Sequence, residues 1–174
     1  GEIAHHGPDY DKAKEHWGFS KPSKPKLPLR VLGEHPIDRF INLQLKEAKL
    51  PANSRAEDGL LVRRVFYDLI GLPPAPEEVD EYVNDENSEK FSNLVDRLLM
   101  SSHYGEKWGR HWLDLVRYAE TNGYERDGNK PEIWRYRDYV IDSFNQNKPY
   151  DRMILEHIAG DELPGADAAS ITVT

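Results

Sequence analysis

The chain has 174 residues, of which 38% are hydrophobic and 31% are charged, and no apolar run is long enough to span a bilayer. Its 23 basic and 31 acidic residues give a formal net charge of -8, which repels phosphate backbones, so we expect no nucleic-acid partner. The absence of cysteine excludes disulfides, thiolate catalysis and covalent haem attachment through Cys-x-x-Cys-His.

The first 36 residues are predicted to form an extended arm or linker. Several prolines between Trp17 and Pro36 restrict the residues before them to extended conformations and remove amide donors. Trp17 and Phe19 could anchor this arm as a polyproline-type strap on a domain surface. A tail ordered only by its neighbours is an equally good interpretation.

Residues 37–174 are predicted to form one helical domain, because apolar residues recur there with a helical period. The predicted helices run from Ile37 to Lys49, from a Ser54 capping box to Gly71, from Pro76 to Val83, from a Ser88 cap to Leu99, from Tyr104 to Ala119, from Pro131 to Asn145 and from Asp151 to Gly160. An alternating pattern at 170–174 could form a strand. The predicted fold class is all-α, an irregular bundle of about six or seven helices.

Nine short motifs together resemble the planctomycete cytochrome c-associated domain, over about residues 17 to 174. They are Ile37–Phe40, Leu69–Pro74, Leu94–Leu99, His103–Glu106, Arg110–Leu115, Arg117–Ala119, Trp134–Val140, Pro149–Asp151 and Ala159–Leu163. In that family the module usually lies in large exported proteins, after a cytochrome c-like domain and before a C-terminal companion domain.

The resemblance implies an extracytoplasmic, multi-domain protein in which haem c belongs to a neighbouring domain and this chain carries no cofactor. The chain would then be a C-terminally truncated fragment, a non-haem interaction module that contacts its neighbouring domains and supports a redox or electron-transfer assembly. Members of the family have no settled activity, so the resemblance leaves open whether the chain is an enzyme.

The segment 103–127 has the densest mixture of aromatic, basic and acidic residues in the chain. The candidate site residues are His111, Asp114, Arg117, Tyr118, Glu120, Asn122, Tyr124, Glu125 and Asp127. On a helical wheel, Trp108, Trp112 and the apolar residues from Leu115 to Ala119 form one face, which is expected to pack in the core.

Each of these polar residues has a structural and a functional interpretation. Asp114 can reach Arg110, Arg117 and Tyr118 at helical spacing, which suits a structural ion network more than a pre-oriented catalytic carboxylate. His111 could be a general base, a metal ligand or a proton relay, although a histidine bonded to a backbone carbonyl is commoner.

The loop 120–130 offers oxygen ligands that suit calcium. It does not match an EF-hand, however, because counting from Glu120 the sixth position is Glu125 instead of glycine and the twelfth is Pro131 instead of glutamate. A solvated polar loop is therefore preferred to a calcium site. Aromatic and basic residues at 134–139 could face this loop as a wall for sugars or acidic partners, or could simply pack. The alternative function is therefore part of an enzyme or glycan-binding site that a neighbouring domain completes.

Overall fold

The computed structural model describes residues 10–173 except 30, 32, 34, 125 and 126. The chain separates into two compact units, Gly1–Arg55 and Ala56–Thr174, and each is described by itself. Glu125, one of the candidate site residues, lies outside the described residues.

The first unit contains the short helix α1 (Tyr10–Lys14), the 3-10 turn η1 (Trp17–Phe19) and the helix α2 (Pro36–Glu47). Pro36 opens α2, where its missing N–H costs nothing, and the Nδ1 atom of His35 accepts a hydrogen bond from the Ile37 N–H at 3.2 Å. The helix predicted from Ile37 is thereby confirmed. The extended arm at 1–36 and the domain boundary after it stay predictions.

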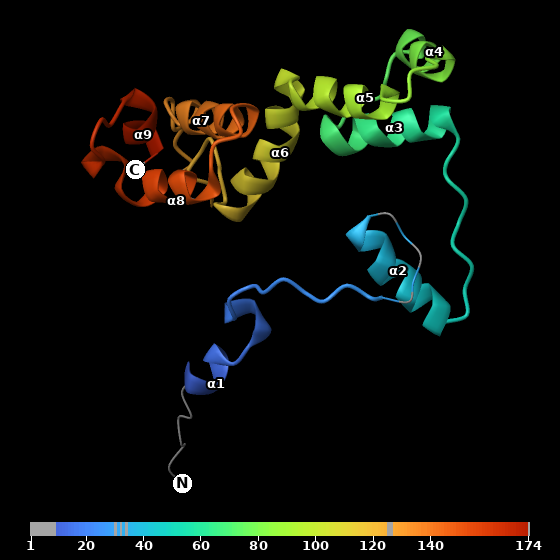
Figure 1. Ribbon diagram of the computed structural model, residues 1–174. Coiled ribbons are helices and arrows are strands. Elements are labelled where there is room, and N and C mark those ends of the chain that lie inside the picture. Colours follow the sequence, from blue (N-terminus) through green and yellow to red (C-terminus); the bar gives the residue numbers. More distant parts are fainter. Residues whose placement is uncertain (1–9, 30, 32, 34, 125–126, 174) are drawn as a thin grey trace. The chain divides into compact units, whose positions relative to one another are not determined.

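Helices are the regular elements of the second unit, and its described residues contain no strand, so the predicted all-α class is confirmed (Figure 1). Its elements are α3 (Asp58–Leu69), α4 (Pro76–Asn84), α5 (Lys90–Leu99), α6 (Ser102–Leu115), α7 (Trp134–Asn145), α8 (Tyr150–Ala159), η3 (Gly160–Glu162) and α9 (Ala168–Val173). None of the described helices is long and apolar enough to cross a membrane.

Several predicted helix starts are wrong in detail: α7 begins at Trp134 rather than Pro131, and α8 begins at Tyr150 with Pro149, not Asp151, at its N-cap position. The capping box from Ser54 to Glu57 does not form, because α3 begins only after Glu57 and the Glu57 side chain bonds none of the free N–H groups. Ser88 does not cap α5 either. The Asn87 side chain accepts from the Glu89 N–H at 2.9 Å instead, one residue earlier than the pattern suggested.

The last described residues form helix α9, so the strand considered for 170–174 is wrong. The Asp167 carboxylate accepts from the Ser170 N–H at 2.8 Å, and the Ser170 hydroxyl accepts from the Asp167 N–H at 2.9 Å. This reciprocal pair satisfies two donors that a helix start leaves free, and it decides the local structure in favour of a helix.

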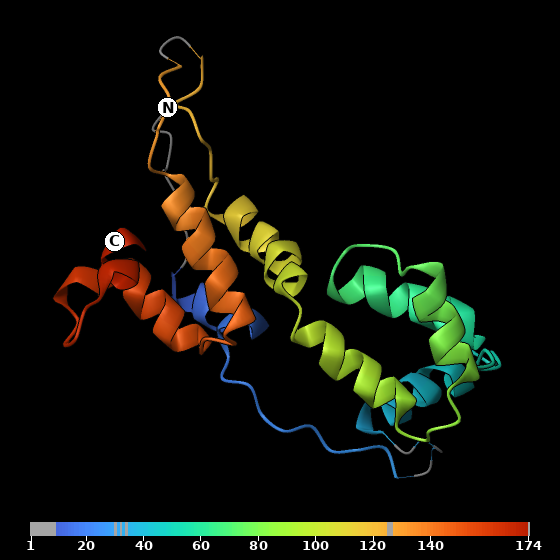
Figure 2. The same ribbon diagram turned by 90° about the horizontal axis from the view of Figure 1, so that it is seen from above.

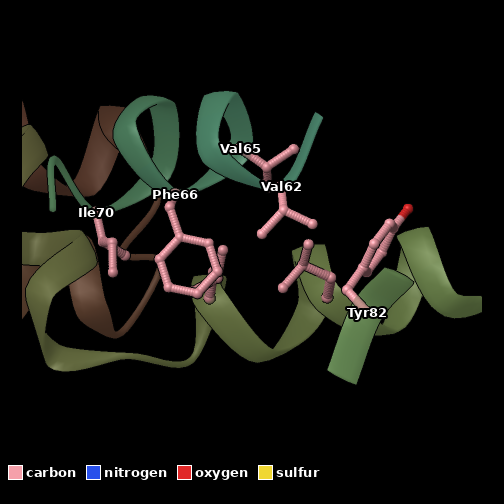
Figure 3. Packing of buried hydrophobic residues seen from close by; sticks show 7 residues of the cluster. Val62, Val65, Phe66, Ile70 and Tyr82 are labelled. Atoms are coloured by element: carbon pink, nitrogen blue, oxygen red, sulfur yellow. The ribbon is translucent and has the colours of Figure 1, made fainter. Parts of the chain in front are cut away.

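The first hydrophobic cluster holds α3, α4 and α5 together (Figure 3). Its buried members are Val62, Val65, Phe66, Ile70, Tyr82, Leu94 and Leu98. At its edge the Lys90 ammonium donates to the Asp58 carboxylate at 2.7 Å and lies over the Tyr82 ring. This pair joins the start of α5 to the start of α3.

The second cluster lies where α6, α7 and α8 meet, and it is built on Tyr139, Val140 and Met153. Helices α6 and α7 lie side by side (Figure 2) because Gly105 and Gly109 leave room on α6 for the α7 backbone. The Asn145 side chain accepts from the Gly105 N–H at 2.7 Å and donates to the Ser102 carbonyl at 3.2 Å, so α7 also caps the first turn of α6.

Candidate functional site

Helix α6 ends four residues earlier than predicted, at Leu115. Arg117 takes a left-handed conformation (φ 55°), and the Tyr118 N–H donates to the Leu113 carbonyl at 2.9 Å, which closes the helix. As a result Leu115 is 77% exposed and Val116 and Ala119 are also exposed, so their predicted place in the core is wrong.

The two tryptophans of α6 do pack inward, as predicted. The Trp108 indole N–H donates to the Leu69 carbonyl at 3.2 Å, which links α6 to the end of α3. Trp112 packs against the second cluster, and its indole N–H lies 3.0 Å from the Tyr136 hydroxyl. Both rings therefore use their single donor inside the protein.

His111, Asp114 and Arg117 are exposed and do not form the predicted ion network. No described residue makes an ion pair or a side-chain hydrogen bond with Asp114 or Arg117, and the His111 ring only lies against Trp108, 5.4 Å between centroids. The chain leaves the helix at Val116, so the helical spacing that would bring Arg117 and Tyr118 to Asp114 is lost. Arg110 keeps its helical spacing to Asp114, and nothing in the structure explains why these two do not pair.

The segment after Tyr118 folds back on itself as a hairpin-like loop. Thr121 and Asn129 form an antiparallel bridge, isolated among the described residues. The Lys130 N–H donates to the Glu120 carbonyl at 2.9 Å and the Asn122 N–H to the Gly128 carbonyl at 3.0 Å. The loop thus has a bonded base, where Glu120 and Lys130 lie opposite each other.

The Asp127 side chain forms hydrogen bonds with other residues of the same loop near its tip. Its carboxylate accepts from the Thr121 hydroxyl and, at 3.0 Å, from the Gly123 N–H, and these two bonds, in that order, hold the pKa of Asp127 below its usual value. Asn122 is exposed, and Tyr124 is 92% exposed with a left-handed backbone (φ 55°). Neither side chain makes a hydrogen bond with Tyr118 or Glu120 among the described residues.

Of the predicted site residues, the structure brings Tyr118 and Glu120 together. The Tyr118 hydroxyl donates to the Glu120 carboxylate at 3.3 Å, and the Arg137 guanidinium from α7 donates to the same oxygen at 3.4 Å. Burial, and then the negative charge of Glu120, raise the pKa of Tyr118. The Tyr118 ring stacks on the Tyr136 ring, with 6.4 Å between centroids.

A hollow of about 490 Å³ lies between the base of the loop and the first turn of α7. Its lining residues are Glu120, Thr121, Asn129, Lys130, Pro131, Ile133, Trp134 and Arg137. The expected wall at 134–139 is therefore divided: Trp134 and Arg137 face this hollow, whereas Tyr139 is buried in the second cluster.

Sequence reasoning missed a buried charge cluster on α8. Glu156, whose side chain is only 7% exposed, accepts from Tyr139 at 2.6 Å, from Lys148 at 2.6 Å and from Arg152 at 2.7 Å. Burial alone raises the pKa of Glu156, but these donors outweigh it and lower the pKa to about 2. Burial, and then the bond to Glu156, raise the pKa of Tyr139. Only the i, i+4 spacing of Arg152 and Glu156 was visible in sequence.

A second missed group surrounds His157. Its Nδ1 atom lies 2.7 Å from the Met153 carbonyl, so it carries the proton, and Nε2 accepts from the Tyr136 hydroxyl at 2.9 Å and from the Trp112 indole at 3.2 Å. Burial raises the pKa of Tyr136, partly opposed by the bond from Trp112. These groups come from three helices, so no local sequence pattern could predict that they contact one another.

The described residues contain no group of three or more histidine, aspartate or glutamate side chains placed to hold a metal ion. In the loop, the Asp127 carboxylate is already bonded to Gly123 and Thr121, and Glu120 is bonded to Tyr118 and Arg137.

The comparison with protein families decides the identity of the module. Residues 36–174 match the model of the PSCyt2 family, described as a protein of unknown function (DUF1549). The chain belongs to the PSCyt2 family. Its name is that of the planctomycete cytochrome c-associated domain, so the resemblance seen in the motifs is confirmed, although the match begins at Pro36 rather than near Trp17. No curated protein and no solved structure matches the chain.

The PSCyt2 match includes the whole second unit and starts at the first residue of α2. It therefore includes all candidate site residues, the hollow beside Trp134 and the two networks on α8. The matched motif at Trp134–Val140 contains residues of all three: Trp134 and Arg137 in the hollow, Tyr136 beside His157, and Tyr139 on Glu156.

Proposed function

We propose that this PSCyt2 chain is a non-haem helical interaction module of a multi-domain, extracytoplasmic protein linked to a cytochrome c. Its partners are neighbouring domains of the same protein, one of which carries haem c. The module has no haem-attachment motif of its own, and it supports a redox or electron-transfer assembly by holding its neighbours in place.

The observation that carries this proposal is the exposed apolar face of α8. Leu155 and Ile158, three residues apart on one face of the helix, are 45% and 73% exposed. The opposite face is fixed by Met153 in the core and by Glu156 in its charge cluster. Large apolar side chains that share one exposed face of a helix are typical of an interaction surface.

A binding titration tests this proposal. The chain is titrated into the cytochrome c-like domain of its own full-length protein by calorimetry, as the native sequence and as the double variant Leu155→Ser, Ile158→Ser. We expect micromolar binding that the double variant weakens by at least about tenfold, since burying two such side chains is worth a few kcal/mol. The control variant Met100→Ser removes an 87% exposed residue after α5 and leaves binding unchanged.

Absence of binding to the cytochrome c-like domain and to the C-terminal companion domain would contradict the proposal. The same applies if the native chain and the double variant bind equally well, because α8 would then not be the contact surface.

A further inference from the structure

The hollow beside Trp134 has the size of a small-ligand site. Its volume of about 490 Å³ lies within the range of ligand pockets, roughly 300 to 1,000 Å³. One wall is the bonded base of the loop, where Glu120 and Lys130 pair through their backbones. The other wall is the first part of α7, so the two sides are held by independent hydrogen bonds.

The polar groups around the hollow are a balanced set of donors and acceptors. Glu120 is an acceptor and Arg137 a donor, joined in an ion pair at 3.4 Å. Thr121 and Asn129 can donate and accept. The Lys130 ammonium has no partner among the described residues. The hydroxyl groups of a sugar both donate and accept hydrogen bonds. A site with both donors and acceptors therefore suits a sugar better than a site with donors alone or acceptors alone.

The aromatic side of the hollow is Trp134, which differs from the tryptophans of α6. It is 42% exposed, and its indole N–H has no partner in the part of the chain that the structure describes, whereas Trp108 and Trp112 bond inside the protein. The Arg135 guanidinium lies over one face of the Trp134 ring, 5.1 Å from its centroid. Such a ring offers a flat apolar surface with a donor at its edge.

Other ligand classes fit this arrangement less well. A purely apolar ligand would have to desolvate the Glu120 and Arg137 charges, which is costly without new hydrogen bonds. An anion would meet the carboxylate of Glu120 in the hollow, and the Arg137 guanidinium is already shared between Glu120 at 3.4 Å and Asp138 at 3.1 Å. A neutral ligand rich in hydroxyl groups avoids both costs.

We infer that this hollow binds a short neutral saccharide, with a sugar ring on Trp134 and its hydroxyl groups on Glu120, Arg137 and Asn129. This activity is separate from the contact surface on α8, so either one can fail without the other.

Calorimetry of the full chain against cellohexaose, xylohexaose, mannohexaose and maltohexaose tests the inference, with hexagalacturonate as the acidic comparison. We expect at least one neutral oligosaccharide to bind with a dissociation constant below about 1 mM. Trp134→Ala should weaken that binding at least about tenfold and Glu120→Gln at least about fivefold. Tyr124→Ala, at the exposed tip of the same loop and outside the hollow, should leave it unchanged.

Nuclear magnetic resonance of the same sample separates loss of binding from loss of fold. The indole N–H signal of Trp134 should shift on addition of the saccharide while those of Trp108 and Trp112 stay in place, and the amide spectra of both variants should match the native one away from the loop. Binding of hexagalacturonate alone, binding that survives Trp134→Ala, or no binding by any of the neutral probes would each overturn the inference.

Discussion

Glu156 is the carboxylate most strongly held by its surroundings in the second unit. Three donors from α7, α8 and the turn between them converge on it, and its side chain is almost fully removed from water. Removing one member of a buried charge cluster leaves the others without a partner, and this costs more than the cluster itself contributes.

We therefore predict that Glu156→Gln lowers the free energy of unfolding by about 3 kcal/mol at pH 7, measured by urea denaturation. Glu132→Gln removes an exposed carboxylate paired with Arg135 and should change it by less than about 0.5 kcal/mol. Equal stability of Glu156→Gln and the native protein would contradict the described cluster.

The pH dependence of this loss follows from the direction of the pKa shift. The folded protein keeps Glu156 ionised down to about pH 2, against 4.5 for an ordinary glutamate, so its stabilisation is complete above pH 4.5 and disappears as the pH falls towards 2. The gap between native protein and Glu156→Gln should narrow over this interval. A gap that is constant down to pH 2 would show that another group is responsible.

Two buried tyrosines, Tyr139 and Tyr82, differ in whether the hydroxyl group has a hydrogen-bond partner, so removing the hydroxyl should affect stability differently. The Tyr139 hydroxyl donates to Glu156 at 2.6 Å, whereas the Tyr82 hydroxyl is buried with no hydrogen-bond partner among the described residues. Tyr139→Phe should cost about 2 kcal/mol of unfolding free energy, and Tyr82→Phe should cost nothing or stabilise. Thermal denaturation followed by circular dichroism compares them, and a large loss in Tyr82→Phe would reveal a partner for that hydroxyl.

At the scale of elements, the close contact of α6 and α7 depends on Gly105. A Cβ atom added there would overlap the Ile141 carbonyl oxygen and the Asn145 side chain, both part of α7. At Gly109, one turn later, the nearest atom would be a Val140 methyl at 3.4 Å, which is tight but movable.

We predict that Gly105→Ala destabilises the protein by about 2 kcal/mol or more, because the overlap outweighs the gain in helix propensity. Gly109→Ala should change the stability by less than about 1 kcal/mol, since its smaller clash is offset by the same gain. Urea denaturation of both variants is the measurement, and equal effects would mean that the helices do not cross at Gly105.

Helices with strong apolar periodicity were predictable from sequence, and their ends were not. Pro36 and Gly71 are visible signals and mark the ends of α2 and α3 correctly. The end of α6 was missed because Arg117, not glycine, takes the left-handed conformation, and sequence gives no sign that an arginine will do so. Because the helix was predicted four residues too long, Leu115 was wrongly expected in the core and Arg117 was wrongly expected beside Asp114.

For the whole molecule, sequence could not show which side chains meet across helices. The candidate residues from His111 to Asp127 are neighbours in sequence, yet among those that the structure describes, a side-chain hydrogen bond joins only Tyr118 and Glu120. Conversely His157 and Trp112 are 45 residues apart and share a hydrogen bond. Local patterns predict elements, whereas these networks depend on how α6, α7 and α8 pack.

The proposed function requires that α8 presents an interaction surface to neighbouring domains of the same protein. Hydrogen–deuterium exchange along α8 can be measured in the full-length protein and in this chain alone. We predict slower exchange along α8 in the full-length protein, with α4 unchanged as an internal control. Identical exchange of α8 in the two samples would contradict the proposal.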